Sequence, residues 1–397
     1  MQKLEKWKEE QGQSGVAIKI KGSPNEYTNI ANTNQIRQYL GLQQQIYQSK
    51  FNAKENSKNN QLNKKLMPIG FYDLIFAEAE NNHRQVNDII DYFMGQGYRL
   101  IKPSLVEFAN QYLQDNKNSK SENLLYFTDL FSGENMVFRN DITSQIARIL
   151  NSSLANYNLP LKLCYSGDVI ASKSDELYAH RQQTQLGLEI IHYTENYSEI
   201  EVIEKTLFAV NNILLPPLSK NNILPKILIE FSLPKFLEKL LNEFNLKPFP
   251  SLIQAIFDKN ISNAKNLLSQ IENLDISKQE LLIEIMLNNH NLGNIISKIM
   301  ACNVSDAIIP MIDKINKIFQ FINNRFPNIE VCFDLFGNKK SNDYCGLFFE
   351  IFVGNFSYPV ARGGSYKITA DNNGEESLID AVGATIYINH LHPQIIK

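Results

Sequence analysis

The stretch Gln183-Thr184-Gln185-Leu186-Gly187-Leu188-Glu189-Ile190-Ile191 decides our interpretation of the fold. Successive side chains of an extended strand point to opposite faces. One face then carries Leu186, Leu188 and Ile190, which can enter a core. The other face carries Gln185, Gly187 and Glu189. Such a face suits a small ligand with an amino group: the carboxylate supplies charge, the amide orients the ligand, and glycine leaves room. A half-solvated antiparallel strand with ordinary polar residues outside is the alternative.

Composition and charge limit the classes of function. The chain has 397 residues and a net charge of −3 at pH 7, which argues against a dominant nucleic-acid surface, so we expect no nucleic-acid partner. The first ten residues are strongly charged and no apolar run approaches a membrane span, so we expect a cytoplasmic protein without a membrane partner. The four cysteines lack Cys-x-x-Cys spacing, and we expect no disulfide, metal or cofactor.

The chain divides into an extension and a folded domain. Gln, Asn, Lys and Ser dominate residues 1–66, which we interpret as a largely disordered extension with room for a short helix at about 33–48 and a linker at 51–65. The folded domain is expected at 67–397. Within it, Leu and Ile recur at helical spacing over about 233–325, which predicts a helical insertion without residues suited to chemistry.

The beginning of the domain predicts a helix and then a strand. Apolar residues at helical spacing predict an amphipathic helix at about 76–94, which Gly95-Gln96-Gly97 ends. The segment Tyr98–Leu105 resembles a strand and contains Pro103, a residue that belongs at an edge or an irregularity. A pair of strands is expected further on, at about 124–130 and 135–139.

The segment Arg139-Asn-Asp141-Ile-Thr143-Ser-Gln145-Ile-Ala-Arg148 follows this pair. Thr143 is a suitable N-cap for a helix with an apolar inner face. Asp141 and Thr143 therefore have two interpretations: they cap the helix, or they lie at the mouth of a ligand site. The residues themselves leave both open.

The C-terminal third carries a second group of polar and aromatic residues. A strand is expected at 328–336, and a final helix at about 376–391. Gly363-Gly364 allows either a turn or a close approach of the backbone. Alternation in a further strand would place on one face Tyr344, Gly346, Phe348 and Glu350.

Three segments resemble, in order, the three motifs of class II aminoacyl-tRNA synthetases. The helix and strand of 76–105 resemble motif 1, the dimer interface of those enzymes; the strand, loop and strand of 161–193 resemble motif 2; and 376–391 resembles motif 3. The resemblance covers about 67–391. It implies an α+β fold with an antiparallel sheet flanked by helices and interrupted by the helical insertion. Histidyl-tRNA synthetases continue into an anticodon-binding domain, and we expect none here.

In detail the chain resembles the histidyl branch. The motif 2 return strand of that branch carries Gln-x-Gly-x-Glu, and strands of the form Tyr-x-x-x-x-Phe-Glu and Gly-Gly-Arg-Tyr-Asp line its histidine pocket. The resemblance implies a histidine-binding set of Asp141, Thr143, Gln185, Glu189, Tyr344 and Tyr366. It implies that Asp141 and Glu189 hold an ammonium group, that Gln185 orients the ligand, and that the tyrosines supply walls and hydroxyl groups.

The parts that bind ATP in synthetases are missing. Ala171 stands where motif 2 carries an arginine for the α-phosphate, and Ala179 stands at the loop position for the outer phosphates. Asn389-His390 replace the Glu-Arg that ends motif 3, and Lys339–Tyr344 replaces the histidyl-specific Arg-Gly-x-Asp-Tyr-Tyr. Lysine is a poor substitute for arginine in planar bidentate recognition, and polyphosphate in a transition state needs fixed positive charge. We therefore expect no catalytic residues and no adenylation activity.

The Asp-x-Thr-x-Gln-x-Ala-Arg form of 141–148 resembles the regulatory subunits of ATP phosphoribosyltransferase, which are paralogues of histidyl-tRNA synthetase. The resemblance implies a non-catalytic partner of the short-form catalytic subunit, feedback by L-histidine in the first step of histidine biosynthesis, and a homodimer core within a hetero-oligomer. Two other hypotheses remain: a residual ligase that activates histidine for an acceptor other than tRNA, and a histidine-binding orphan paralogue without a catalytic partner.

Overall fold

The structure, a computed structural model, describes most of the chain from Met67 to Leu391 and two short strands before it. The described residues are 16–19, 27–30, 67–115, 123–173, 180–192, 197–216, 225–246, 250–272, 274–287, 292–302, 308–337, 344–354, 358–372 and 375–391. The short strands β1 (Val16–Lys19) and β2 (Tyr27–Ile30) pair antiparallel. The helix expected at 33–48 and the linker expected at 51–65 lie outside the described residues.

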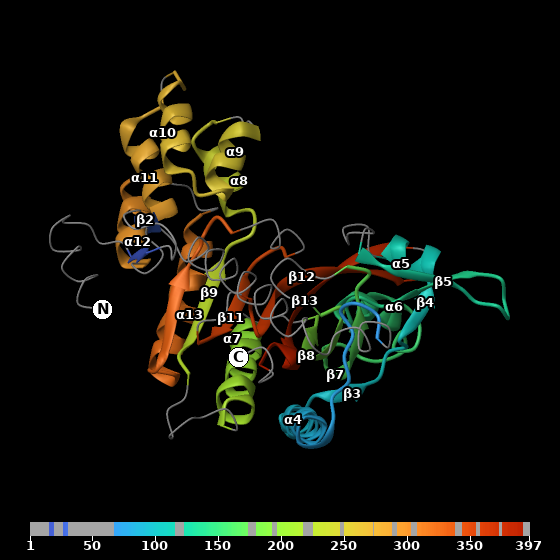
Figure 1. The fold of residues 1–397 in the computed structure, drawn as a ribbon. Helices are drawn as coiled ribbons and strands as arrows, with labels where there is room; N and C mark the ends of the chain where they lie inside the picture. The colour runs from blue at the N-terminus through green and yellow to red at the C-terminus, as the bar shows by residue number, and fades with distance from the viewer. Residues whose placement is uncertain are drawn as a thin grey trace.

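An eight-stranded sheet forms the centre of the domain, in the order β10-β9-β11-β12-β13-β8-β7-β3 (Figure 1). The strands are β3 (Arg99–Ile101), β7 (Leu161–Ile170), β8 (Gln182–Ile191), β9 (Ile227–Ser232), β10 (Ile329–Phe333), β11 (Phe348–Val353), β12 (Ala361–Asn372) and β13 (Glu375–Tyr387). Neighbours pair antiparallel except at the two ends, where β10 pairs parallel with β9 and β3 parallel with β7. The expected α+β class with its antiparallel sheet is confirmed. The two edge strands are the exceptions, because each runs parallel to its neighbour.

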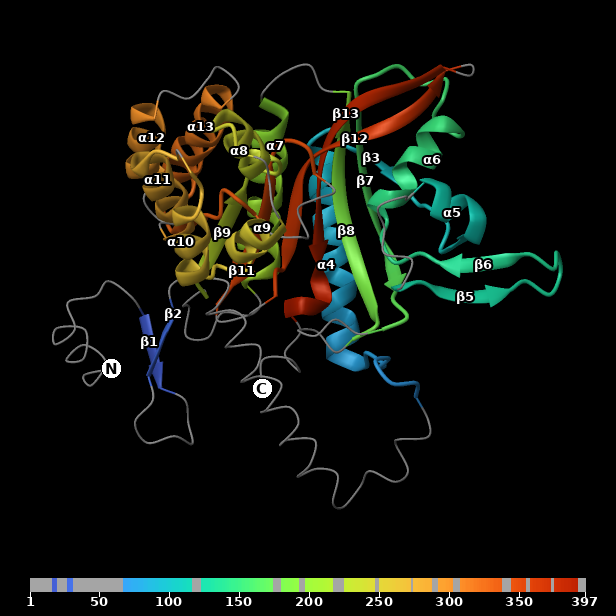
Figure 2. The same cartoon turned by 90° about the horizontal axis from the view of Figure 1, so that it is seen from above.

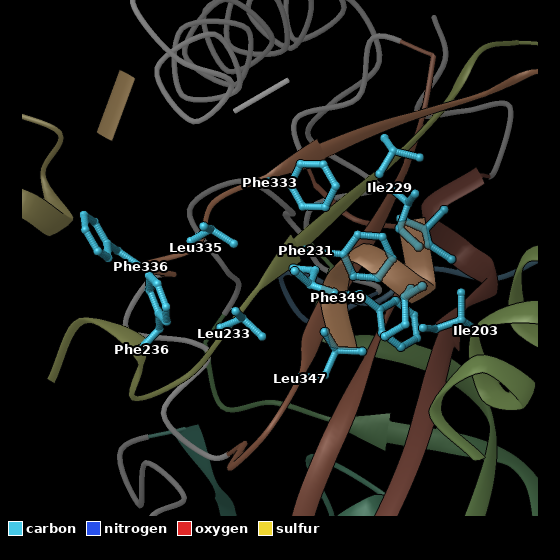
Figure 3. Close-up of a cluster of buried hydrophobic side chains, with 14 of the residues drawn as sticks. Ile203, Ile229, Phe231, Leu233, Phe236, Phe333, Leu335, Phe336, Leu347 and Phe349 are labelled. Carbon is cyan, nitrogen blue, oxygen red and sulfur yellow. The ribbon is translucent and has the colours of Figure 1, made fainter. Parts of the chain in front are cut away.

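Helices cover one face of this sheet and bury its apolar side chains. They are α4 (Phe76–Gly95), α7 (Tyr197–Phe208), the π-helix η3 (Ala209–Leu214) and α13 (Ile309–Arg325). Leu186, Leu188 and Ile190 of β8 lie in this core, as their alternation predicts. Figure 3 shows the part where Phe231 and Phe349 of neighbouring strands, with ring centroids 6.3 Å apart, join the same cluster. Apolar burial of this kind is the main favourable contribution to folding.

A small second sheet extends from the other end of the domain (Figure 2). It contains β4 (Val106–Phe108), β5 (Leu125–Thr128) and β6 (Asn135–Phe138) in the order β4-β6-β5, next to α5 (Ala109–Asp115). The expected strand pair is therefore confirmed as the β5–β6 hairpin. The chain continues through the 3-10 helix η2 (Thr143–Gln145) into α6 (Ile146–Asn151), which packs against β12.

Helices fill the stretch between β9 and β10, as expected. They are α8 (Phe236–Glu243), α9 (Pro250–Phe257), α10 (Ile261–Ser269), α11 (Ile276–Leu287), α12 (Leu292–Ala301) and α13. Their buried residues belong to the same hydrophobic cluster as the sheet. The division of 67–397 into a domain with an insertion at 233–325 stays a prediction.

Two buried polar contacts join these helices to the sheet. Lys259, between α9 and α10, pairs with Asp334, directly after β10. Lys314 of α13 pairs with Glu199 of α7 at 3.0 Å. Glu199 is completely buried and also accepts a hydrogen bond from the hydroxyl of Ser365 in β12.

Two expectations for the C-terminal third are wrong. The segment 375–387 is strand β13, and only the 3-10 helix η6 (Ile388–Leu391) falls within the helix expected at 376–391. The β-branched and aromatic residues of this segment favour a strand. The strand expected from Tyr344 begins at Phe348.

Gly363 and Gly364 lie inside β12 and not in a turn. A Cβ atom on Gly363 would lie 2.4 Å from the carbonyl oxygen of Gly383, and one on Gly364 would lie 2.1 Å from that of Leu347. The glycine pair therefore permits close approach of neighbouring backbone, which is the other of its two interpretations.

We predict that Lys259→Met lowers the free energy of unfolding by about 3–5 kcal/mol, because the Asp334 carboxylate loses its lysine inside the protein. Lys298→Met is the matched control. Lys298 pairs with Glu284 at 3.0 Å, but its side chain is 43% exposed, so a loss of about 1 kcal/mol or less is expected. Urea unfolding followed by circular dichroism measures both values. Equal losses in the two variants would contradict the importance of the buried pair.

Candidate functional site

The face of the sheet that points away from the large core carries a row of polar residues, here named the polar face. Residues that pair directly across neighbouring strands point to the same face. The register joins, in a continuous row, Tyr165, Gly187, Thr385, Arg362, Glu350 and Glu230. Alternation along β8 adds Gln185 and Glu189, which are 3% and 0% exposed. The half-solvated strand, one of the two interpretations of β8, is therefore wrong.

Glu189 is the most deeply buried acid of the polar face. Its carboxylate accepts hydrogen bonds from the hydroxyls of Tyr366 at 2.7 Å, Thr143 at 3.2 Å and Tyr165 at 3.4 Å. Burial nevertheless raises the pKa of Glu189 to about 8, and the hydrogen bonds only partly oppose this effect. Near neutral pH this carboxyl group can therefore either hold a proton or accept one from a ligand.

Glycines make room for these side chains. A Cβ atom on Gly383, which lies opposite Glu189 on β13, would come within 1.6 Å of a Glu189 carboxylate oxygen. A Cβ atom on Gly187 would lie 2.2 Å from the ring of Tyr165. The gap at Gly187 therefore holds this ring and not a ligand, contrary to our interpretation of the sequence.

Asp141 and Gln185 lie together at the loop that enters η2. An Asp141 carboxylate oxygen accepts a hydrogen bond from the amide of Ser144 at 3.0 Å, and Gln185 accepts one from the amide of Ile142 at 3.1 Å. Burial raises the pKa of Asp141, while hydrogen bonds from Ser144 and Gln185 oppose this shift. Asp141 thus caps the helical turn, the role expected of Thr143, whose hydroxyl instead bonds Tyr165 and Glu189.

The two candidate tyrosines complete the site. Tyr344 lies against Gly364, since a Cβ atom on Gly364 would be 2.7 Å from the Tyr344 ring. The ring centroids of Tyr344 and Phe348 are 4.7 Å apart. Burial raises the pKa of both Tyr344 and Tyr366 well above the ordinary value, so both hydroxyls stay protonated. The structure therefore brings together all six residues that the sequence indicated.

Two residues of the site were missed. Tyr165 of β7 bonds both Thr143 and Thr385, at 2.9 and 3.0 Å, and links three strands with the loop. Arg362 of β12 lies 3.5 Å from Glu350 and over the Tyr387 ring, 5.3 Å from its centroid. Alternation of Arg362 with Tyr366 on one face of β12 was the available signal.

Neighbouring residues in the sequence hold the loop of Asp141 in place. Gln145 donates a hydrogen bond to Glu107 of β4 at 2.5 Å, and Arg148 of α6 pairs with the same carboxylate at 2.6 Å. The buried Arg139 donates hydrogen bonds to the carbonyl oxygens of Pro103 and Asp168, each at 2.8 Å. The charged residues of this segment thus hold the loop. The Arg139 guanidinium also lies at the β7 end of the polar face, where a Cβ atom on Gly167 would be 2.2 Å from it.

The positions at which the resemblance predicts the loss of ATP-binding arginines carry residues with structural contacts. The carbonyl oxygen of Ala171 accepts a hydrogen bond from the Arg181 side chain at 2.9 Å. Asn389 is buried and accepts a hydrogen bond from the Thr184 amide at 2.5 Å. His390 is also buried, with Nδ1 2.6 Å from the carbonyl oxygen of Pro359. Outside the described residues lie Ala179 and 339–343.

The described residues contain no group of three or more His, Cys, Asp or Glu side chains that could hold a metal ion. None of the helices in the described parts of the chain combines the length and the apolar character needed to cross a membrane. All four cysteines are free thiols.

We predict that the protonation of Glu189 makes stability pH-dependent. Because the folded-state pKa of about 8 exceeds the ordinary 4.5, the folded protein holds a proton that the unfolded chain releases between these values. The free energy of unfolding should therefore fall as pH rises from about 4.5 to about 8, by on the order of 5 kcal/mol at most.

Glu189→Gln removes this titration. The Tm of the variant minus that of the wild type should therefore be more positive at pH 8.5 than at pH 5.5, as measured by differential scanning calorimetry. Glu134→Gln, at an exposed position of the β5–β6 hairpin, is the control and should follow the wild type at both pH values. A pH-independent difference for Glu189→Gln would show that this carboxyl group does not titrate in this range.

Comparison with known proteins places the chain in a family. Relatives named ATP phosphoribosyltransferase regulatory subunit include that of Paramagnetospirillum magneticum, 24% identical over 335 residues (82% of this chain, 81% of the relative). That of Hahella chejuensis is 25% identical over 305 residues (76% of this chain, 72% of the relative).

Solved structures share the fold. An ATP phosphoribosyltransferase regulatory subunit/histidyl-tRNA synthetase from Bacillus halodurans C matches with a TM-score of 0.67 and 18% identity over 86% of this chain and 85% of the other. The ATP phosphoribosyl transferase (HisG:HisZ) complex from Thermotoga maritima contains a chain that matches with a TM-score of 0.57 and 19% identity. The match covers 79% of this chain and 98% of the other. A family model described as histidyl-tRNA synthetase matches residues 70–391, and the chain therefore belongs to the histidyl-tRNA synthetase family.

Proposed function

We propose that this chain is the non-catalytic regulatory subunit of ATP phosphoribosyltransferase, required for the activity of a short-form catalytic subunit and for feedback by histidine in the first step of histidine biosynthesis. The match to relatives of that name over 82% of this chain and 81% of the relative carries the proposal. The similar chain in the HisG:HisZ complex of Thermotoga maritima supports a hetero-oligomer with a catalytic partner.

L-histidine is the proposed ligand of the polar face. Asp141 and Glu189 provide two buried or half-buried acids, and histidine provides two groups that carry positive charge, the α-ammonium group and the imidazole. A cationic ligand group offsets the cost of burying a carboxylate. The pKa of Glu189 near 8 suits an imidazole, which itself titrates close to neutral pH.

Loss of adenylation is part of the proposal. Ala171, Asn389 and His390 offer no guanidinium group at the motif positions, and the last two are occupied by contacts with the protein itself. The nearby Arg181 is held by the Ala171 carbonyl oxygen and lies over the ring of Phe71, 4.9 Å from its centroid. These contacts support a subunit that does not use ATP and weigh against the residual ligase.

A homodimer core is also proposed. The edge strand β3 exposes Leu100, and the tip of the β5–β6 hairpin exposes Leu130 and Phe131, which are 98% and 99% exposed. Large apolar side chains at such exposure favour an interface with another chain. Motif 1 of class II synthetases, which β3 resembles, forms their dimer interface.

Reconstitution tests the proposed function. The full chain is mixed with the short-form catalytic subunit of the same organism, and phosphoribosyl transfer to ATP is measured with and without L-histidine. Activation on mixing and inhibition by histidine are expected. Absence of activation would contradict the regulatory role, and if histidine then still raises the Tm, the orphan histidine-binding protein is favoured. Histidine-dependent pyrophosphate exchange into ATP would contradict the loss of adenylation.

We predict that Asp141→Asn lowers the affinity for histidine roughly 10- to 100-fold, since a hydrogen bond to a charged group contributes about 1.5–3 kcal/mol. Asparagine retains an oxygen for the Ser144 amide, so the turn stays capped. Asp129→Asn is the matched control because Asp129 caps the Ser132 amide in the β5–β6 hairpin, outside the site. Isothermal titration calorimetry measures all three proteins, and unchanged affinity in Asp141→Asn would contradict the site assignment.

A further inference from the structure

Arg362 belongs to the polar face, but none of the contacts considered so far gives it a role towards a ligand. β12 places Arg362, Gly364 and Tyr366 on this face in succession, and the hydroxyl of Tyr366 reaches Glu189 at 2.7 Å. Gly364 has no side chain, and the Tyr344 ring lies against it. Arg362 and Tyr366 thus lie at two ends of one segment of β12 with an aromatic ring between them.

Neighbouring side chains fix the position of the guanidinium group. Glu350, opposite Arg362 on β11, lies 3.5 Å from one of its terminal nitrogens, and the Tyr387 ring lies beneath it at 5.3 Å from the ring centroid. Tyr387 is in turn the register partner of Gln185 on β8. The guanidinium group therefore lies between Glu350 of β11 and Tyr387 of β13, and Tyr387 is the neighbour of Gln185 in the sheet.

The charges around Arg362 are almost all negative. Among the described residues that β9, β11, β12, β13 and β8 place on the polar face, Arg362 is the single cation, whereas Glu230, Glu350 and Glu189 are acids. Its positive charge also opposes the upward shift in the pKa of Asp141, which shows that the two groups lie within electrostatic reach. Of the side chains that these five strands place on the face, Arg362 alone can compensate a ligand carboxylate. Arg139 lies at the β7 end of the face, against Gly167.

An α-amino acid carries an ammonium group and a carboxylate on the same carbon atom. On the basis of the function proposed above, we infer that Arg362 binds the α-carboxylate of the amino acid whose ammonium group lies against Asp141. A guanidinium group has five N–H donors in a planar fork, so it can contact Glu350 and a ligand carboxylate together. The Arg362 side chain is 27% exposed and that of Glu350 is 7% exposed, so arginine is the more accessible member of the pair.

Comparison of L-histidine with histamine, which lacks the carboxylate, tests this inference by calorimetry on the full chain. The wild type should bind histidine at least about tenfold more tightly, since a charge-assisted hydrogen bond contributes on the order of 1.5–3 kcal/mol. Arg362→Gln should lower histidine affinity by a similar factor and leave histamine affinity unchanged or higher. Arg362→Lys should recover part of the preference, because lysine retains the charge but not the fork.

Loss of the cation could destabilise the protein through Glu350, and the double variant Glu350→Gln/Arg362→Gln controls for this effect. It removes both charges of the pair and should show the same loss of preference for histidine. Equal losses for histidine and histamine in Arg362→Gln, or a preference for histidine that survives in the double variant, would overturn the carboxylate role.

The outcomes separate this inference from the proposed function. If the wild type binds neither compound, both the histidine site and the role of Arg362 are overturned. If the wild type binds histidine and responds to it in the reconstituted complex, but Arg362→Gln has the same preference as the wild type, the proposed function stands and the role of Arg362 is wrong.

Discussion

The burial of the Glu189 carboxylate is the constraint on which the rest of the site depends. An ionised acid without water is costly unless hydrogen bonds and opposite charge compensate it. Hydroxyls from a loop and from two other strands converge on this one group, and Gly383 leaves the space that it fills. The partners lie up to 177 residues away from Glu189 along the chain. One buried carboxylate thus fixes how the motif 2 strands meet the C-terminal strands.

Most of the fold could be predicted because burial imposes a period on each element. The alternation in β8 and the helical spacing in α4 each indicate which face of the element packs against the core. Strand β13 was mistaken for a helix because its small residues Ala381, Gly383 and Ala384 carry little periodic signal. Their size is set by neighbours on other strands, such as Glu189, and no local pattern contains that information.

The site could be predicted where the residue types themselves carry chemistry in a familiar order. The acid Glu189 and the amide Gln185 of β8 stood out, and the resemblance supplied the loop and the tyrosines. Tyr165 and Arg362 were missed for a different reason. Each derives its position from register across the sheet, beside Gly187 and Glu350 respectively, and register depends on pairing between distant segments.

Strand β12 is held through both of its faces. Tyr366 bonds Glu189 on one side, while Ser365 bonds Glu199 on the other, and Glu199 is paired with Lys314 of α13. A slip of one residue would exchange the two faces and break both contacts. The separation of Arg362 and Tyr366 is therefore fixed at about 13 Å of backbone, four residues at roughly 3.3 Å each. The strand consequently sets the spacing of its polar side chains before any ligand arrives, so that binding need not supply the free energy to arrange them.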